Sequence, residues 1–238
     1  MEQGVIDVGS LAGGIDLQAT VESGQSYLWN REDGEMYQRD GGTGDDAWYW
    51  TTVRRDGSPA VIRVRQRDGV LEWESTIDAE ADLKRLLRLR DDLSAIRTTA
   101  PADDVVQSAY DRFWGMRLVQ DPPFGSLISF ICSARCAWPD TQYATALRDA
   151  FGETVEFDGR TYNAYPTPSA LAETTEERLR DLGLGYRAPY VQRTAEMVAG
   201  GEATRRKPSV STTRTPGSRS PASSRRRQGR GLRVAVLA

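Results

Sequence analysis

The sequence predicts an α+β protein with an antiparallel β-sheet domain at residues 1–98, an α-helical bundle at residues 99–200, and a basic tail at residues 201–238. Three observations lead to this expectation. Between residues 5 and 75, short β-rich segments alternate with Asp-Gly pairs, which are typical of hairpin turns. From Ala79 onward, apolar residues recur at helical spacing. After Glu202 the sequence is mostly Thr, Ser, Pro and Arg, a composition that cannot form a packed core.

The N-terminal segment reads as an antiparallel meander. Hairpin turns are expected at Asp56-Gly57 and Asp68-Gly69. The expected strands are Val5–Val8, Ile15–Val21, Trp48–Val53, Val61–Arg65 and Val70–Glu74. The tryptophans of this segment should supply its core and the face that it turns to a helix; they are Trp29, Trp48, Trp50 and Trp73.

The helical pattern begins with an apolar stripe whose members are Leu83, Leu86, Leu87 and Leu93. The opposite side carries Lys84, Arg85, Arg88 and Arg90, which suits either DNA contact or simple solvation. The segment 121–133 is apolar enough to be central to a helical bundle. Other helices are expected at Asp103–Trp114, Ser169–Glu173, Thr174–Leu182 and Arg187–Ala199.

Charge is unevenly distributed along the chain. Residues 204–238 hold ten Lys or Arg and no Asp or Glu, which leaves 21 basic and 34 acidic residues before them. Phosphate contacts favour the opposite sign, so an acidic body is unusual for a protein that binds DNA. Proteins adapted to concentrated salt carry this bias, and we therefore hypothesise a halophilic source.

Metal and cofactor chemistry are not expected. The chain has no histidine, and Cys132 and Cys136 alone are too few for a structural zinc or an iron–sulfur cluster. No apolar run approaches 18 residues and no signal peptide opens the chain. We therefore expect a monomer of cytoplasmic location, without a membrane partner.

The segment 179–190 organises the helical part. Thr174 and Glu177 have the spacing of a capping box, and Gly183 falls where a helix takes a left-handed C′ residue. Tyr186 and Arg187 follow at once, in the turn between two helices. A rigid aromatic and a cation held there suit contact with a nucleic-acid stack and its phosphates. The other interpretation is that Tyr186 packs in the core and Arg187 is solvated.

Three motifs support a family resemblance. They are SGQSYLW at residues 23–29, DPPFGSLISFICS at 121–133 and LRDLGLGYRAPYV at 179–191, and in this order they resemble the 8-oxoguanine DNA glycosylase family. The resemblance covers roughly residues 1–200. It implies a sheet domain like the TATA-binding protein, followed by a helical bundle of the helix-hairpin-helix glycosylase type. It also implies excision of oxidised guanine from duplex DNA, with lyase activity, in base-excision repair.

The resemblance implies roles for three residues. Gly24 would read the oxidised base through its carbonyl, although an ordinary β-bulge also accounts for a glycine there. Tyr186 would wedge into the gap left by a flipped nucleotide, and Arg187 would lie by the opposite strand. The partner would be double-stranded DNA containing oxidised guanine.

No residue of this chain matches the family's catalytic lysine, which lies in a hairpin resembling Pro-Gly-Val-Gly-x-Lys-Val-Ala-Asp-Cys. Lys84 and Lys207 are the only lysines, and neither fits the motif. By family resemblance the function is that of a glycosylase and lyase, but we expect this chain as written to be inactive. The alternative is a catalytically dead fragment that binds damaged DNA. An unrelated scaffold would require three ordered motif matches by chance.

Synonymous codons suggest a cause for the missing hairpin. Residues 225–234 can be encoded so that a one-base shift reads Val-Gly-Asp-Lys-Val-Ala-Asp-Cys-Val. A similar shift around Arg135–Pro139 restores a helical string like the family's. We therefore expect a chain that is frameshifted and truncated before the catalytic hairpin.

Overall fold

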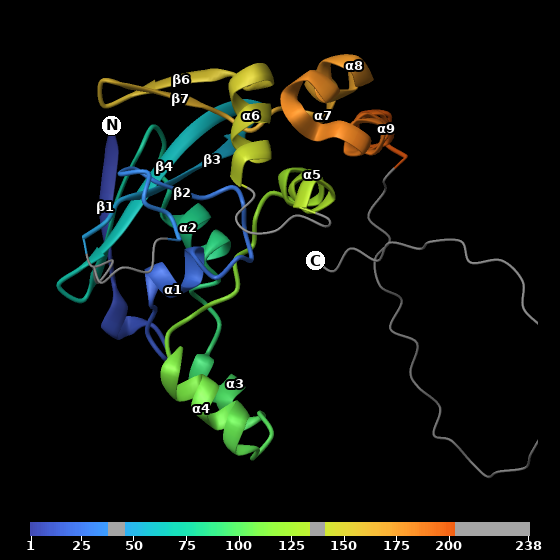
Figure 1. Cartoon of the computed structure of the whole chain (residues 1–238). Coiled ribbons are helices and arrows are strands. Elements are labelled where there is room, and N and C mark those ends of the chain that lie inside the picture. Colours follow the sequence, from blue (N-terminus) through green and yellow to red (C-terminus); the bar gives the residue numbers. More distant parts are fainter. Residues whose placement is uncertain (38–45, 134–140, 203–238) are drawn as a thin grey trace, which may run out of the picture. The chain divides into compact units, whose positions relative to one another are not determined.

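The computed structural model describes residues 1–37, 46–133 and 141–202, all of which belong to one unit of the chain, Met1–Ala203. Its main sheet has five antiparallel strands in the order β1-β5-β4-β3-β2 (Figure 1). The strands are β1 (Glu2–Asp7), β2 (Asn30–Arg31), β3 (Tyr49–Arg55), β4 (Ser58–Arg67) and β5 (Val70–Ser75). The α+β class and the antiparallel sheet are confirmed.

The expected Asp-Gly hairpins are confirmed by backbone geometry. Asp56 and Gly57 have φ of 53° and 85°, and Asp68 and Gly69 have φ of 48° and 78°. Two successive residues with positive φ match the twist of the flanking strands, and Asp followed by Gly tolerates that conformation. These turns set the register that places Thr51 opposite Ile62 and Val64 opposite Trp73.

The strand expected at Ile15–Val21 is wrong, because this segment forms helix α1 (Leu17–Val21). Asp16 is its N-cap, and the Asp16 carboxylate accepts a hydrogen bond from the Ala19 N–H at 2.8 Å. Leu17, Thr20 and Val21 are buried, at the spacing of one helical face. The N-cap hydrogen bond and the burial of this face favour the helix more than the β propensity of these residues favours a strand.

Helices follow the sheet. They are α2 (Glu80–Leu86), α3 (Leu93–Thr98), α4 (Asp104–Arg112), α5 (Pro123–Ser133), α6 (Thr141–Phe151), α7 (Pro168–Ala172), α8 (Glu176–Leu179) and α9 (Ala188–Ala199). Shorter helical turns are η1 (Val8–Ser10), η2 (Arg180–Leu184) and η3 (Gly185–Arg187). In the described parts of the chain, no helix is both long and apolar enough to cross a bilayer.

A second hairpin, β6 (Thr154–Phe157) with β7 (Arg160–Asn163), was not expected. Its turn is again an Asp-Gly pair, Asp158-Gly159, with φ of 51° and 70°. The hairpin packs on the main sheet, where the Trp50 and Tyr162 rings meet edge to face at 4.9 Å. The Tyr162 hydroxyl also donates a hydrogen bond to Glu32 at 3.0 Å.

Among the described residues two large hydrophobic clusters form most of the core, and a small third one joins Val61 to Phe157 and Tyr162 of the second hairpin. The first joins the main sheet to α1 and α2 and includes Trp29, Trp73 and Leu83. The second joins α5, α6, α7 and α9, with Ile128, Leu147 and Val191 among its buried members. This division resembles the expected two domains, but their boundary at residues 98–99 stays a prediction.

Ile128 of α5 is fully buried against α9 and its neighbours. The basic side of α2 is neutralised locally. Lys84 pairs with Glu80 at 2.5 Å, and Arg85 with Asp82 at 3.3 Å. Such i,i+3 and i,i+4 pairs indicate a solvated helix face rather than one kept free for DNA.

Gly115 permits a close approach that the fold requires. It has φ of 91°, and a Cβ built there would lie 2.8 Å from the Asp16 nitrogen. Its carbonyl accepts the Asp16 N–H at 2.9 Å, which fixes the start of α1.

We expect Gly115→Ala to lower the free energy of unfolding by more than Gly57→Ala does. Both positions have positive φ, and that strain alone costs about 1–2 kcal/mol. No atom lies within 4 Å of a Cβ at Gly57, so only Gly115→Ala adds a backbone clash. Urea denaturation of both variants measures the difference, and equal midpoints would contradict the close approach.

Candidate functional site

The loop after α1 carries Gly24. Gly24 has φ of 81°, and a Cβ at this position would meet no atom within 4 Å. No strand runs through this segment, so the β-bulge interpretation of Gly24 is wrong. The glycine lies in an open loop that keeps its backbone accessible, a property required wherever a ligand contacts main-chain atoms.

Gln25 anchors this loop to the segment that leads into α5. The Gln25 Nε2 donates to the Arg117 carbonyl at 3.0 Å, and the Val119 N–H donates to Gln25 Oε1 at 3.1 Å. Nε2 also donates to the Ser23 hydroxyl at 2.8 Å. One side-chain amide therefore satisfies two backbone groups on a segment 92 residues away in sequence, and it fixes the position of the neighbouring Gly24.

Arg117 secures the segment to which Gln25 binds. Its guanidinium, 2% exposed, donates to the carbonyls of four residues in two other loops. These acceptors are Gly14 at 2.8 Å, Arg88 at 2.8 Å, Asp91 at 3.0 Å and Ala12 at 3.1 Å. Burial lowers the pKa of Arg117, with the charge of Asp91 opposing the change. The sequence offered no sign of this residue, because its partners are backbone atoms distant in sequence.

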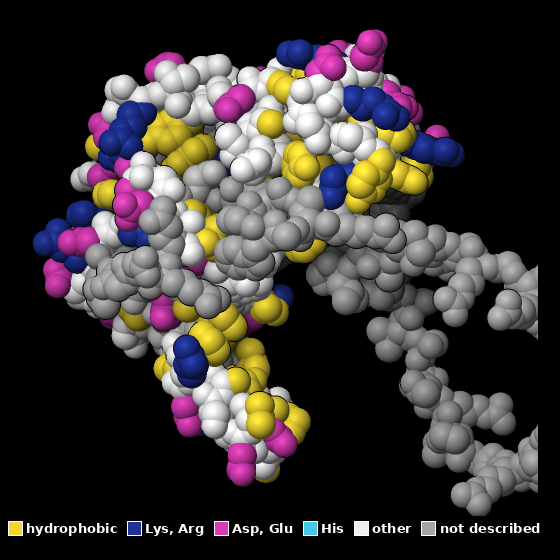
Figure 2. All heavy atoms as spheres, viewed as in Figure 1, with side chains coloured by type: hydrophobic (Ala, Val, Ile, Leu, Met, Phe, Trp, Pro, Cys, Tyr) yellow, Lys and Arg dark blue, Asp and Glu magenta, His cyan; other side chains and the backbone are white. Residues whose placement is uncertain are grey.

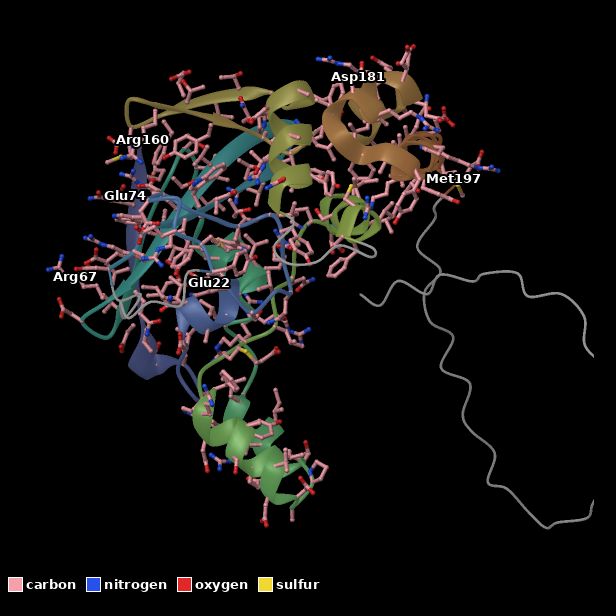
Figure 3. All side chains as sticks on the ribbon, viewed as in Figure 1. Glu22, Arg67, Glu74, Arg160, Asp181 and Met197 are labelled. Carbon is pink, nitrogen blue, oxygen red and sulfur yellow. The ribbon has the colours of Figure 1, made fainter. Side chains whose placement is uncertain are left out.

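A set of buried polar groups lies next to the loop. The Tyr49 hydroxyl donates to Glu22 Oε1 at 2.6 Å, and the Tyr37 N–H donates to Glu22 Oε2 at 3.2 Å. Glu22, labelled in Figure 3, follows directly after α1. Burial raises the pKa of Tyr37 to about 12 and also raises that of Tyr49, so both phenols are neutral hydrogen-bond donors at neutral pH.

Asp121 precedes α5 in the same region. Burial raises the pKa of its carboxyl to about 6, while the nearby polar groups of Ser26 and Trp29 oppose the rise. Ser26 and Trp29 belong to the Gly24 loop, so this carboxyl lies beside that loop. Ionising a carboxyl group in such surroundings is costly.

The turn with Tyr186 and Arg187 is built around two glycines. Gly183 has φ of 87°, as expected of a C′ residue, and Gly185 has φ of 54°. The N-cap of the preceding helix is Thr175 rather than Thr174, since the Thr175 hydroxyl accepts from the Arg178 N–H at 3.1 Å. Asp181, at the start of this turn, is labelled in Figure 3.

Tyr186 and Arg187 differ sharply in exposure. The Tyr186 side chain is 55% exposed, whereas Arg187 is only 7% exposed. The Arg187 guanidinium carbon lies 4.7 Å from the centre of the Tyr186 ring and 5.4 Å from that of Tyr143. Arg187 therefore supports the exposed Tyr186 ring by a cation–π contact. Of the two residues, Tyr186 is the one that presents its surface to a partner.

Helix α5 connects these two regions. Its exposed Phe130 meets Tyr27, three residues after Gly24, edge to face at 5.8 Å. The buried face of α5 packs on α9 in the second core cluster. Figure 2 shows hydrophobic side chains gathered near α9, and Tyr186, Tyr190 and Met197 are among the exposed ones. Helix α5 thus contacts both the loop that carries Gly24, through Tyr27, and helix α9, which follows Tyr186. Nothing in the sequence singles out Tyr27 or Phe130.

Comparison with known proteins identifies the family. Residues 10–127 match the model of the 8-oxoguanine DNA glycosylase, N-terminal domain. The chain belongs to the 8-oxoguanine DNA glycosylase family. A probable N-glycosylase/DNA lyase of Methanothermobacter thermautotrophicus is 28% identical, over 69% of this chain and 63% of that protein. The chain thus spans less than two thirds of the length of this relative.

Solved structures have the same fold. The structure of MBOgg1 in complex with a low-affinity DNA ligand matches with a TM-score of 0.68 and 25% identity, over 86% of this chain and 68% of that one. Clostridium acetobutylicum 8-oxoguanine glycosylase/lyase, bound to double-stranded DNA with cytosine opposite 8-oxoguanine, matches with a TM-score of 0.66 and 23% identity. This match covers 80% of the present chain and 61% of the Clostridium acetobutylicum chain.

The expected frameshifts lie outside the described residues, since they concern residues 135–139 and 225–234. Cys136 lies outside them as well. Cys132 is buried in the second core cluster, as expected of a small apolar residue.

We expect Asp121→Asn to change how stability depends on pH. The pKa of Asp121 in the folded chain, about 6, lies above its ordinary value of 3.8, so the folded chain binds the proton more tightly. Stability from this group therefore rises as pH falls from about 7 to about 4, by up to about 3 kcal/mol. Asp121→Asn should remove that rise. Urea midpoints across this pH range test it, and parallel curves for the two proteins would refute the burial of a costly carboxylate.

Proposed function

We propose that this protein takes part in base-excision repair by recognising oxidised guanine in duplex DNA. Glycosylase and lyase chemistry is the activity of its family, and no residue of this sequence matches the lysine that carries it out. The observation that carries the proposal is the Gly24 loop, open at the glycine and fixed through Gln25 to residues 117–119. Family membership and the DNA ligand bound by MBOgg1 support the same interpretation. Such a substrate would place the protein in the cytoplasm, with the nucleoid.

Gly24 would read the base through main-chain atoms. A glycine with positive φ and open surroundings allows a flat ring to approach the backbone more closely than any side chain would permit. A base can reach this position only after it leaves the helical stack, at a cost of a few kcal/mol. The anchored loop loses little freedom on binding, which helps to offset this cost.

Tyr186 would occupy the gap left by the flipped nucleotide. Its ring is exposed and backed by the Arg187 guanidinium, so it enters the stack already oriented. Stacking on an aromatic side chain contributes about 1–3 kcal/mol per base. Arg187 would act near the opposite strand, mainly by holding Tyr186.

A second function is favoured by one observation on lysine. Lys84 is the only lysine among the described residues, and it pairs with Glu80 on α2. A lysine that forms a Schiff base must have its amine free to attack the sugar, whereas the Lys84 amine is bound to Glu80. A protein that binds damaged DNA without cleaving it is therefore the alternative. The halophilic source remains a hypothesis based on charge alone.

We expect Tyr186→Ala to weaken binding to a duplex containing 8-oxoguanine by about tenfold or more, which corresponds to the loss of one stacking contact. Phe113→Ala is the control, because Phe113 is an exposed aromatic that follows α4. Fluorescence anisotropy with labelled duplex measures both variants. Unchanged affinity for Tyr186→Ala would remove the wedge assignment.

Borohydride trapping separates the two functions. A lyase forms a Schiff base with the sugar of the lesion, and reduction converts it into a stable covalent complex. The whole chain should give such a complex with 8-oxoguanine duplex if it is an enzyme. Lys84→Met should leave trapping unchanged, because Lys84 is paired on α2. Lesion-specific binding without any trapped complex would favour the alternative.

A further inference from the structure

A cavity of about 270 Å³ lies away from Gly24 and Tyr186, neither of which lines it. Its walls come from β3, α2, the first turn of α5, α6 and the segment after β7. Most of the walls are apolar, with Leu28, Val53, Phe124, Pro166 and Pro168 among the lining residues. A concave, mostly apolar pocket with a few polar groups is the usual form of a small-molecule site.

The charge of the lining is entirely positive. Arg54, Arg85 and Arg148 line the cavity, and no Asp or Glu does. The chain as a whole has a net charge of −3, so this local excess runs against its composition. Arg54 pairs with Glu153 at 2.7 Å and Arg85 pairs with Asp82 at 3.3 Å. Arg148 is the lining arginine that forms no such ion pair among the described residues.

Arg148 is a buried cation with neutral partners. It is 3% exposed and donates to Asn30 Oδ1 at 3.0 Å and to the Ala144 carbonyl at 3.4 Å. Its guanidinium carbon lies 5.2 Å from the centre of the Trp50 ring. Among the described residues Arg148 forms no ion pair; the charge of Asp149, which accepts a hydrogen bond from Asn163, opposes the lowering of its pKa, but burial has the larger effect. A buried charge without an opposite charge is costly unless a ligand supplies one.

Two further features favour an anion. The first turn of α5 lines the cavity with Phe124 and Gly125, and the first N–H groups of a helix lack intrahelical partners and carry positive partial charge. The Tyr165 hydroxyl, also in the lining, is buried without a well-aligned hydrogen-bond partner. Burial lowers the pKa of Arg148 to about 10, so its guanidinium remains charged at neutral pH.

We propose that this cavity binds the phosphate group of a small phosphate ester, with the apolar part of the ester against the proline and phenylalanine walls. Arginines together with a helix N-terminus suit a phosphate, which accepts several hydrogen bonds at once. The phosphate comes either from a free ester or from the end of a nucleic-acid strand. This proposal does not depend on the glycosylase function.

Calorimetric titration of the whole chain with phenyl phosphate tests the proposal. We expect a dissociation constant on the order of 1 mM or lower at about 0.15 M salt. Arg85→Glu should weaken binding about tenfold, which corresponds to the loss of a charge-assisted contact. Lys84→Glu is the matched control, because it makes the same charge change on the same helix at a residue that does not line the cavity.

Arg148→Met should also weaken binding about tenfold, and Arg85→Glu still decides the matter if Arg148→Met fails to fold. Competition by a duplex with a terminal phosphate would identify a nucleic-acid source, and its absence a free ester; both support the site. The proposal is overturned if phenyl phosphate does not bind, if Arg85→Glu and Lys84→Glu weaken binding equally, or if benzoate binds more tightly.

Discussion

The arrangement of the N-terminal half depends on the buried guanidinium of Arg117. It donates to the carbonyls of Ala12, Gly14, Arg88 and Asp91, which come from two loops about 75 residues apart in sequence. The Arg117 N–H donates to the Thr20 hydroxyl of α1 at 3.0 Å. Hydrogen bonds to a charged donor are stronger than neutral ones, and four loop carbonyls would otherwise be left unsatisfied in the interior. Among the described residues, the guanidinium donates only to neutral carbonyls. Arg117 therefore holds chain segments together without an ion-pair partner in the described part of the chain.

The hydrogen bonds of Arg117 also make the candidate site rigid. Arg117 fixes the segment 115–119, Gln25 binds the backbone of that segment, and Gly24 is the next residue. Asp121, further along the segment, lies beside Ser26 and Trp29 of the loop. A loop that needs an accessible glycine would ordinarily be mobile, since glycine adds conformational freedom. Here the freedom is removed by contacts on both sides of the glycine while the glycine itself stays open.

Sequence reasoning succeeded where the decisive interactions are local. Asp-Gly pairs predicted two hairpins and Gly183 predicted a left-handed turn, because each depends on the φ that one or two residues can adopt. The same Asp-Gly signal at residues 158–159 would have revealed the β6–β7 hairpin. The β propensity of residues 15–21 predicts a strand there, whereas the hydrogen bond from the Ala19 N–H to the Asp16 carboxylate favours the helix that forms.

The missing parts of the site are those that depend on distant contacts. Nothing in the sequence near Arg117 indicates that its partners are carbonyls of residues 12–14 and 88–91. The pairing of Tyr27 with Phe130 likewise spans about 100 residues. Gly24, Tyr186 and Arg187 were selected through family resemblance, and their roles remain proposals. The structure adds a physical distinction that the resemblance lacked, since Tyr186 is exposed while Arg187 is buried behind it.

The distribution of charge bears on how such a protein would approach DNA. Many arginines of the sheet form ion pairs with carboxylates: Arg55 pairs with Asp82 and Arg65 with Glu72, and the buried Arg63 pairs with Glu74. Paired cations release few counterions on binding, so long-range attraction to phosphate should be weak. Recognition must then depend on short-range contacts, namely stacking on Tyr186 and main-chain contact at Gly24. Those contacts form only when a base has left the stack, so an acidic surface would reduce binding to intact duplex more than binding to a lesion.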